Sequence, residues 1–272
     1  MRRLASVTVA VAMIAISGFA AHRPTASAGT GINVISITCP FSHRNMDDPI
    51  VHPGKVGASH MHDFFGNQST NAHSTYATMR EASTTCRALS DTAGYWTPSV
   101  IGPTRAIRPR RVNVYYRGDS GTSPFPADLR IVAGATVGTP AGGGRVFWSC
   151  GTFVDDVHSA TMVSCDTGRL TASVNFPFCW DGVLTHTNDT SHLTYSEACP
   201  SGSRLPRLAI HIKYPIRDGG SGNYNLASDA QMGTSMGRSL HADFWNTWDQ
   251  EVLEATVARC LGGGVNCRDF RG

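Results

Sequence analysis

The sequence is poor in charged residues and poorer still in lysine. Only 16% of the 272 residues are charged, and Lys55 and Lys213 are the only lysines. This low charge, together with 28 glycines and 14 prolines, excludes a charged disordered chain and a coiled coil. A long helical bundle is also excluded, because glycine and proline interrupt the chain too often.

Several catalytic signatures are missing as well. The sequence has no G-x-G-x-x-G, no Walker A loop, no H-E-x-x-H and no C-x-x-C pair. These absences argue against nucleotide-dependent enzymes, zincin proteases, zinc ribbons and thioredoxin-type redox sites. An uncommon hydrolase or lyase remains compatible with the sequence.

The N-terminus has the pattern of an export signal. Arg2 and Arg3 precede an apolar stretch over residues 4–19, and an A-x-A cleavage site follows at residues 26–28. We therefore predict a signal peptide over residues 1–28 and a single secreted domain over residues 29–272. No other stretch approaches the ~18 apolar residues that a membrane helix needs.

Charge gives no reason to expect a nucleic-acid partner. Arg2, Arg3 and Arg23 lie in the predicted signal, and removing them from the 23 basic residues leaves 20, equal to the 20 acidic residues. A mature chain without net charge lacks the global field that attracts nucleic acid or an anionic membrane. We expect a monomer.

Cysteine usage agrees with export. The chain has eight cysteines, an even number that favours disulfides in an exported protein. Sequence alone does not fix their connectivity. We expect nearest-neighbour pairing, which gives Cys39–Cys86, Cys150–Cys165, Cys179–Cys199 and Cys260–Cys267, and each bridge would contribute about 2–4 kcal/mol.

Short β-like runs separated by turn residues dominate the remaining chain. Residues 111–116 alternate apolar and polar side chains, and further runs lie at 34–37, 129–132, 146–148, 170–176 and 208–214. From Phe244 to Cys260 the apolar spacing is instead helical, with Asp243 as the expected N-cap. We predict a mainly β protein, a disulfide-stapled β-sandwich with jelly-roll-like topology as one form, carrying a C-terminal amphipathic helix.

Two segments have the spacing of metal ligands. His60 and His62 would project from one face of an extended chain, and His241 and Asp243 repeat the same spacing. Three imidazoles and one carboxylate form a plausible ligand set for a divalent metal such as zinc, copper or calcium. Hydrogen-bonded structural histidines and a helix-capping carboxylate are the alternative interpretation.

A third segment could supply acid–base chemistry. Asp181 could be a general acid, a base or a ligand, and His192 and Tyr195 could form an acid–base pair. Trp180 could stack on a sugar ring. Alternatively, Trp180 packs on a disulfide through Cys179 and Asp181 makes a turn.

Taken together, these segments resemble one known family. DPIVHPG, SHMHDFFGN, YWTP, FPADLRIVAG, FPFCWDG, SHLTYSEACP and SLHADFWNTWD occur in this order between about residues 39 and 260. This combination is similar to the family called "domain of unknown function nineteen ninety-six", found in secreted fungal and actinobacterial proteins, sometimes beside carbohydrate-binding WSC modules. Those neighbours imply contact with polysaccharide.

The resemblance also implies which residues are characteristic. They are Asp48, Pro49, His60, His62, Tyr95, Trp96, Trp180, Asp181, His192, Tyr195, His241 and Asp243. Two positions depart from the family pattern. Asp128 stands where glycine is usual, and Asp189 stands where the family tends to have a histidine.

We therefore expect a secreted carbohydrate-active hydrolase or lyase that acts on a cell-wall or extracellular polysaccharide. Asp48, Asp181, His192 and Tyr195 would be catalytic, and Tyr95, Trp96 and Trp180 would bind the glycan. Metal ligands would be His60, His62, His241 and Asp243. A non-catalytic carbohydrate-binding or metal-binding module is the alternative, and a disulfide-stapled envelope protein with structural histidines is a third interpretation.

Overall fold

The computed structural model describes residues 33–135, 145–151, 158–166, 169–200 and 202–272. The predicted signal peptide lies outside these described residues. Within them, no helix is long and apolar enough to cross a membrane.

The described chain is mainly β, as predicted. The strands and helices, in chain order, are β1 (Asn33–Asn45), β2 (His62–Gly66), α1 (Tyr76–Arg80), β3 (Gly94–Pro98), β4 (Val100–Ile101), β5 (Ala106–Ile107), β6 (Arg111–Gly118), β7 (Arg130–Gly134), β8 (Val146–Ser149), β9 (Thr171–Asn175), β10 (Cys179–Trp180), β11 (Leu193–Thr194), β12 (Arg207–Lys213), η1 (Gly219–Ser221), β13 (Asn225–Leu226), β14 (His241–Trp245), α2 (Gln250–Thr256) and η2 (Val257–Gly262).

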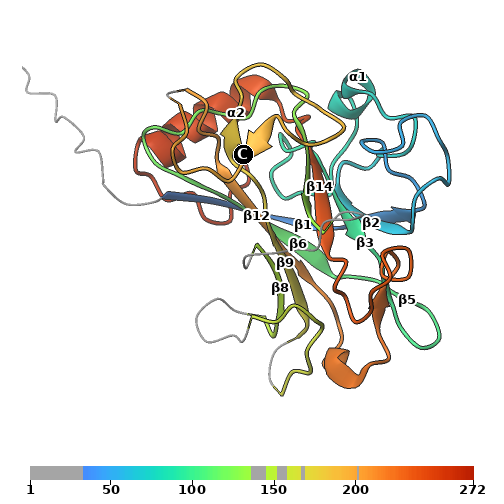
Figure 1. Ribbon diagram of the computed structural model, residues 1–272. Coiled ribbons are helices and arrows are strands. Elements are labelled where there is room, and N and C mark those ends of the chain that lie inside the picture. Colours follow the sequence, from blue (N-terminus) through green and yellow to red (C-terminus); the bar gives the residue numbers. More distant parts are fainter. Residues whose placement is uncertain (1–32, 136–144, 152–157, 167–168, 201) are drawn as a thin grey trace, which may run out of the picture.

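Nine of the strands form one antiparallel sheet in the order β7-β14-β3-β2-β1-β6-β12-β9-β8. β1 joins its two halves: residues 33–40 pair with β6, and residues 41–45 pair with β2, with an irregularity between Phe41 and Arg44 (Figure 1). The sheet curls so that β7, at one end, contacts β9 near the other. The two separate sheets of a sandwich, and a jelly-roll topology, are therefore not confirmed.

The side-chain alternation of the strands explains this architecture. β6 buries every second residue, because one face of this strand covers the core. By contrast, β2, β3 and β14 are buried at every position. Phe65, Tyr95 and Phe244 enter the main core, whereas their neighbours Phe64, Trp96 and Trp245 form a second cluster with Ile50 and Met79.

The C-terminal helix begins later than predicted. Asp243 is not its N-cap, because the residues 241–245 form strand β14. The helix α2 starts at Gln250, and Asp249 is the N-cap whose side chain accepts a hydrogen bond from the backbone N–H of Val252. Asp243 is thereby released from the capping role and lies on the sheet.

The four disulfides pair nearest neighbours, as predicted. They join Cys39 to Cys86, Cys150 to Cys165, Cys179 to Cys199 and Cys260 to Cys267. The first closes the longest loop, with a sequence separation of 47 between its cysteines, and it fastens β1 to the segment that follows α1. A cross-link of this kind removes conformational freedom from the unfolded chain.

A buried carboxyl group organises the main core. Asp91 is fully buried and accepts hydrogen bonds from the Tyr95 hydroxyl at 3.0 Å and from the Ala93 N–H at 3.1 Å. The Tyr95 hydroxyl also bonds the hydroxyl of Tyr116, which accepts from the Trp248 indole. Burial raises the pKa of Asp91 to about 8.

This pKa makes stability depend on pH with a known sign. The folded-state pKa lies above the unfolded value of 3.8, so the stabilising contribution is complete below pH 4 and is lost as pH rises through about 8. We expect the free energy of unfolding to fall by up to about 1.4 kcal/mol per pH unit across this window. Asp91→Asn should lack this component. Denaturant unfolding of both oxidised proteins between pH 5 and 8 measures it, and parallel curves would contradict the assignment.

Candidate functional site

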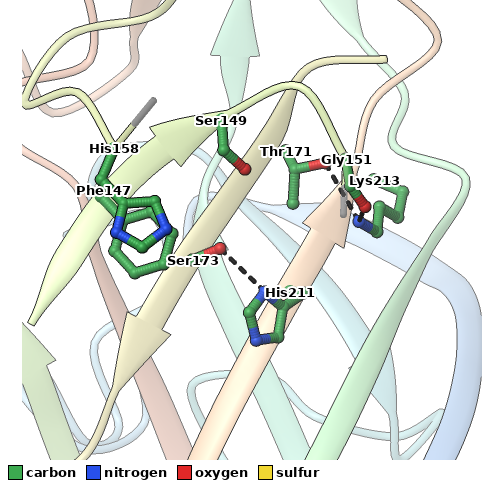
Figure 2. Close-up of a pocket in the computed structure, with 8 residues that line it drawn as sticks. All are labelled: Phe147, Ser149, Gly151, His158, Thr171, Ser173, His211 and Lys213. Atoms are coloured by element: carbon green, nitrogen blue, oxygen red, sulfur yellow. Dashed lines mark hydrogen bonds between the residues drawn. The ribbon is translucent and has the colours of Figure 1, made fainter. Parts of the chain in front are cut away.

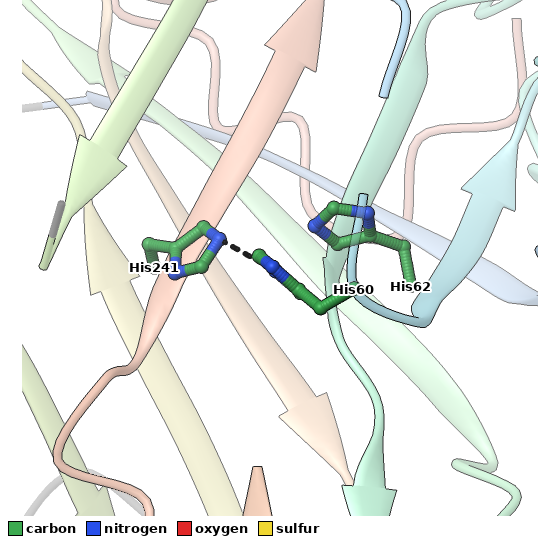
Figure 3. A group of neighbouring side chains, drawn as sticks. All are labelled: His60, His62 and His241. Carbon is green, nitrogen blue, oxygen red and sulfur yellow. Dashed lines mark hydrogen bonds between the residues drawn. The ribbon is translucent and has the colours of Figure 1, made fainter. Parts of the chain in front are cut away.

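Three histidines converge on the face of the sheet opposite the main core. His62 is the first residue of β2, His241 is the first residue of β14, and His60 lies two residues before the start of β2. Their rings face one another, with centroids 4.3 Å apart for His60 and His62, 5.0 Å for His60 and His241, and 5.9 Å for His62 and His241 (Figure 3). The HxH segment at His60 and the HxD segment at His241, which are 181 residues apart in the sequence, thus meet in space.

The Nε2 atoms of these rings lie toward the middle of the cluster. The Nε2 atoms of His60 and His241 lie 3.2 Å apart, and one ligand nitrogen from each of the three rings lies within 4.8 Å of the others. The Nε2 atom of His62 is buried and has no hydrogen-bond partner. A buried nitrogen without a partner is costly, which indicates that this position is built for something other than packing.

The Nδ1 atom of each ring contacts an oxygen acceptor. Nδ1 of His62 lies 3.0 Å from the Asp47 carbonyl, Nδ1 of His241 lies 2.8 Å from the Ser239 carbonyl, and Nδ1 of His60 lies 3.2 Å from Oε1 of Gln231. A backbone carbonyl oxygen can only accept, so Nδ1 of His62 and of His241 carries the proton and the Nε2 atom of each presents a lone pair. The tautomer of His60 is instead set by its contacts with Gln231 and His241. Metal-binding histidines are oriented in this way by their outer-shell partners.

Two carboxyl groups stand beside the histidines. Asp243, two residues after His241 on β14, is fully buried, and neither of its oxygens has a hydrogen-bond partner. Asp48 accepts from the backbone N–H groups of Ile50 and Val51 through one oxygen. One atom from each of Asp48, His62 and Asp243 lies within 4.8 Å of the others, so His62 belongs to both groups.

Burial shifts the protonation of the whole cluster toward its neutral forms. It lowers the pKa of His60, of His62 and of His241, the last to about 4. Burial, reinforced by the nearby Asp48, raises the pKa of Asp243 well above its ordinary value. Neutral imidazoles are the form that binds a metal, because only they offer the lone pair.

The cluster opens into a cavity of about 120 Å³. Its lining combines the site residues with residues from two loops: Asp48, Val51, His52, Ser59, His60, Val132, Ala135, Gln231, Met232, His241 and Asp243. His52 and Gln231 were not selected from the sequence. His52 lies inside the DPIVHPG segment and could have been noticed there, whereas Gln231 carries no sequence signal, because only the fold brings it to His60.

The donor set fits zinc, copper or iron. Zinc binds imidazole nitrogens at about 2.0–2.1 Å with tetrahedral angles, which places two ligand nitrogens about 3.3 Å apart. The 3.2 Å between His60 Nε2 and His241 Nε2 matches that spacing. Calcium, named as an option from the sequence, prefers six to eight oxygen ligands and does not fit three imidazoles.

The third predicted segment lies elsewhere and is held by local contacts. One carboxylate oxygen of Asp181 accepts from the N–H groups of Val183 and Leu184, which closes an exposed turn. The indole of Trp180 donates to the Leu184 carbonyl across the same turn. Neither residue lines the cavity, so the turn accounts for the contacts of both side chains.

His192 and Tyr195 are also engaged structurally. The ring nitrogens of His192 contact the Thr187 hydroxyl at 2.8 Å and the Arg130 carbonyl at 3.0 Å, and its side chain is buried. The Tyr195 hydroxyl donates to the Asn175 carbonyl, and burial raises its pKa to about 12. The expected His192–Tyr195 acid–base pair is thus replaced by two separate backbone contacts.

Tyr95 and Trp96 correct the expectation that they stack on a sugar. Both side chains are fully buried, so neither ring offers a face to a ligand. Tyr95 belongs to the Asp91 network in the main core, and Trp96 packs on Phe64 in the second cluster. Their neighbouring strand positions explain this, because adjacent residues of a doubly buried strand enter opposite cores.

Asp128, the departure from the family glycine, is accommodated by its side chain. Its φ of 64° lies in the left-handed region that glycine adopts freely. The Asp128 carboxylate accepts from the Trp245 indole at 2.7 Å and pairs with Arg130 at 3.1 Å. These contacts offset the conformational energy of the left-handed backbone at Asp128, and they stabilise the start of β7 beside the second cluster.

A second, smaller pocket lies on the other half of the sheet (Figure 2). There Ser173 bonds Nδ1 of His211 at 2.8 Å, and Lys213 contacts the Gly151 carbonyl. The volume is only about 10 Å³, too small for more than a water molecule. His211 is therefore better explained as a hydrogen-bonded structural residue.

Residues 233–237 (GTSMG) match the G-x-S-x-G pattern of hydrolase nucleophiles. The pattern needs a strand–turn–helix context. Here it lies in turns between β13 and β14, so no nucleophile elbow is formed.

Comparison with known proteins gives one match. A family model described as "Domain of unknown function (DUF1996)" matches residues 48–248. No curated protein and no solved structure matches the chain. The matched region begins at Asp48 and contains all three histidines of the cluster, as well as Asp243.

The placement of His192 leads to a test that separates structure from chemistry. We expect His192→Ala to lower the free energy of unfolding by about 2–4 kcal/mol, because it leaves a cavity and unpairs a buried carbonyl. Metal binding should be unchanged. Denaturant unfolding and metal titration measure the two effects, and lost metal binding with unchanged stability would contradict the structural role.

Proposed function

The chain belongs to the family described as a domain of unknown function (DUF1996), and we propose from its site that it is a metal-dependent enzyme. It would be a secreted hydrolase or lyase acting on a cell-wall or extracellular polysaccharide. The single observation that carries this proposal is the histidine cluster. Nδ1 of each imidazole contacts an oxygen acceptor, and one ring nitrogen from each of the three lies within 4.8 Å of the others.

Packing alone does not account for that arrangement. Two Nε2 lone pairs that face each other at 3.2 Å repel unless a cation or a proton lies between them. Nearby, His62 Nε2 and both oxygens of Asp243 are buried without partners. A divalent cation held by the three histidines would place positive charge between these lone pairs and near the Asp243 carboxyl group, which supports the metal centre.

Different residues of the site can then bind the metal, transfer a proton and orient the substrate. A cation held by the three histidines would act as a Lewis acid toward a water molecule or a substrate oxygen. Asp243 lies beside them with both oxygens buried and without hydrogen-bond partners, so it can accept or return a proton. Asp48, anchored through one oxygen by two N–H groups, faces the same cavity and can orient the substrate.

The polysaccharide substrate is supported less directly. A cavity of about 120 Å³ admits a small group or part of one sugar unit, and His52 and Gln231 give its mouth hydrogen-bonding capacity. Four disulfides are compatible with the proposed extracellular location. The aromatic residues expected to bind the glycan do not line this cavity, so recognition would depend on polar contacts.

A non-catalytic metal-binding module is the second candidate. The exposed fractions of His62 and His241 are only 0% and 7%, and deep burial restricts the approach of a polymer. A centre of this kind would bind its metal and leave glycans unchanged.

Metal content is the primary test. We expect the oxidised protein, produced from Gly29 without a histidine tag, to bind about one zinc or copper ion per chain and no calcium at this site. His60→Ala/His241→Ala should weaken binding by more than the 10- to 100-fold typical of outer-shell changes. His73→Ala, at an exposed histidine away from the cluster, is the control. Equal metal content in all three proteins would contradict the assignment.

Turnover distinguishes the two candidates. We expect Asp243→Asn to keep the metal and to lower kcat by about 10²- to 10⁴-fold, because the amide cannot accept the proton. New reducing ends report hydrolysis, and new ultraviolet absorbance reports the unsaturated sugar of a lyase. Metal-loaded wild-type protein that binds glycans without either product would favour the non-catalytic module.

A further inference from the structure

His60 differs from the other two histidines in how its ring is fixed. Nδ1 of His62 and of His241 bonds a backbone carbonyl, whereas Nδ1 of His60 bonds the side-chain oxygen of Gln231. Among the three Nδ1 contacts of the cluster, this is therefore the one that a side-chain substitution can remove. Gln231 is exposed, so its replacement should not disturb the core.

The pair formed by His60 and His241 can exist in two hydrogen-bonded states. Because His241 Nδ1 donates to the Ser239 carbonyl, its Nε2 can only accept. A neutral His60 has one ring proton. With that proton on Nδ1, His60 bonds Gln231 and leaves two lone pairs facing each other; with it on Nε2, His60 donates to His241 across the 3.2 Å gap.

Only the first state is ready for a metal. In the second, the proton occupies the space between the two Nε2 atoms and the pair satisfies itself. We propose that Gln231 is a positioning residue that holds His60 in the Nδ1-protonated tautomer and so keeps the metal position open. This inference rests on the proposed metal centre, and it identifies the residue that regulates access to it.

The loop that carries Gln231 is held firmly enough for this role. The buried carboxylate of Asp229 accepts from the N–H groups of Leu226, Gly237 and Ser239, and from the hydroxyls of Thr234 and Ser239, at 2.7–3.0 Å. Ser239 is also the residue whose carbonyl fixes His241. One carboxylate therefore positions the acceptors for two of the three imidazoles.

The test compares two substitutions at one position. Gln231→Met keeps the length of the side chain and removes the acceptor, whereas Gln231→Glu keeps an acceptor oxygen. Gln68→Met is the matched control, because Gln68 accepts from the Ser83 hydroxyl on an exposed surface away from the cluster. Nitrogen-15 NMR of the histidine rings in zinc-free protein reports the His60 tautomer, and competition with a chelator reports zinc affinity.

We expect Gln231→Met to convert His60 to the Nε2-protonated form and to weaken zinc binding by about 10- to 100-fold. Gln231→Glu and Gln68→Met should retain the wild-type tautomer, and neither should weaken zinc binding. Wild-type protein with His60 protonated on Nε2, or Gln231→Met with unchanged tautomer and affinity, would overturn the proposal. If wild-type protein binds no zinc, the proposed metal centre fails, while the zinc-free spectra still decide the role of Gln231.

Discussion

The burial of β14, β2 and β3 on both faces is the constraint on which the site depends. A strand with water on one side can direct its polar residues outward, but these strands have apolar clusters on both sides. His62, His241 and Asp243 are thus buried away from the bulk solvent. Their polar atoms must find partners within the protein or in a ligand, and several have none within it.

Two loops supply the remaining residues of the site. The segment after β1 supplies Asp47, Asp48 and His52, and the segment between β13 and β14 supplies Gln231 and Ser239. Both are tied by carboxylates: Asp47 accepts from the N–H groups of Gly57 and Ala72, as Asp229 does within its own loop. The sheet therefore sets the position of the rings, and the loops set their orientation.

The spacing of residues in the sequence predicted the histidine pairs of the site, but not the start of the helix or the burial of the aromatic residues. The i, i+2 pairs around His60 and His241 were recognisable because strand periodicity acts over two residues. The helix start was misplaced because Phe244, Trp245 and Trp248 satisfy helical spacing and also a doubly buried strand followed by a turn. Tyr95 and Trp96 resembled sugar-binding aromatics, since sequence does not distinguish a buried ring from an exposed one. Gln231 depends on tertiary placement and could not be predicted.

The use of main-chain carbonyls has a consequence for how the site can change by mutation. Every residue type carries a carbonyl, so substitutions at Asp47 or Ser239 leave the acceptors of His62 and His241 in place as long as the backbone path is kept. Position 231 is different, because its acceptor is encoded by the side chain. A single nucleotide change there can remove the acceptor of His60 while the rest of the fold stays the same.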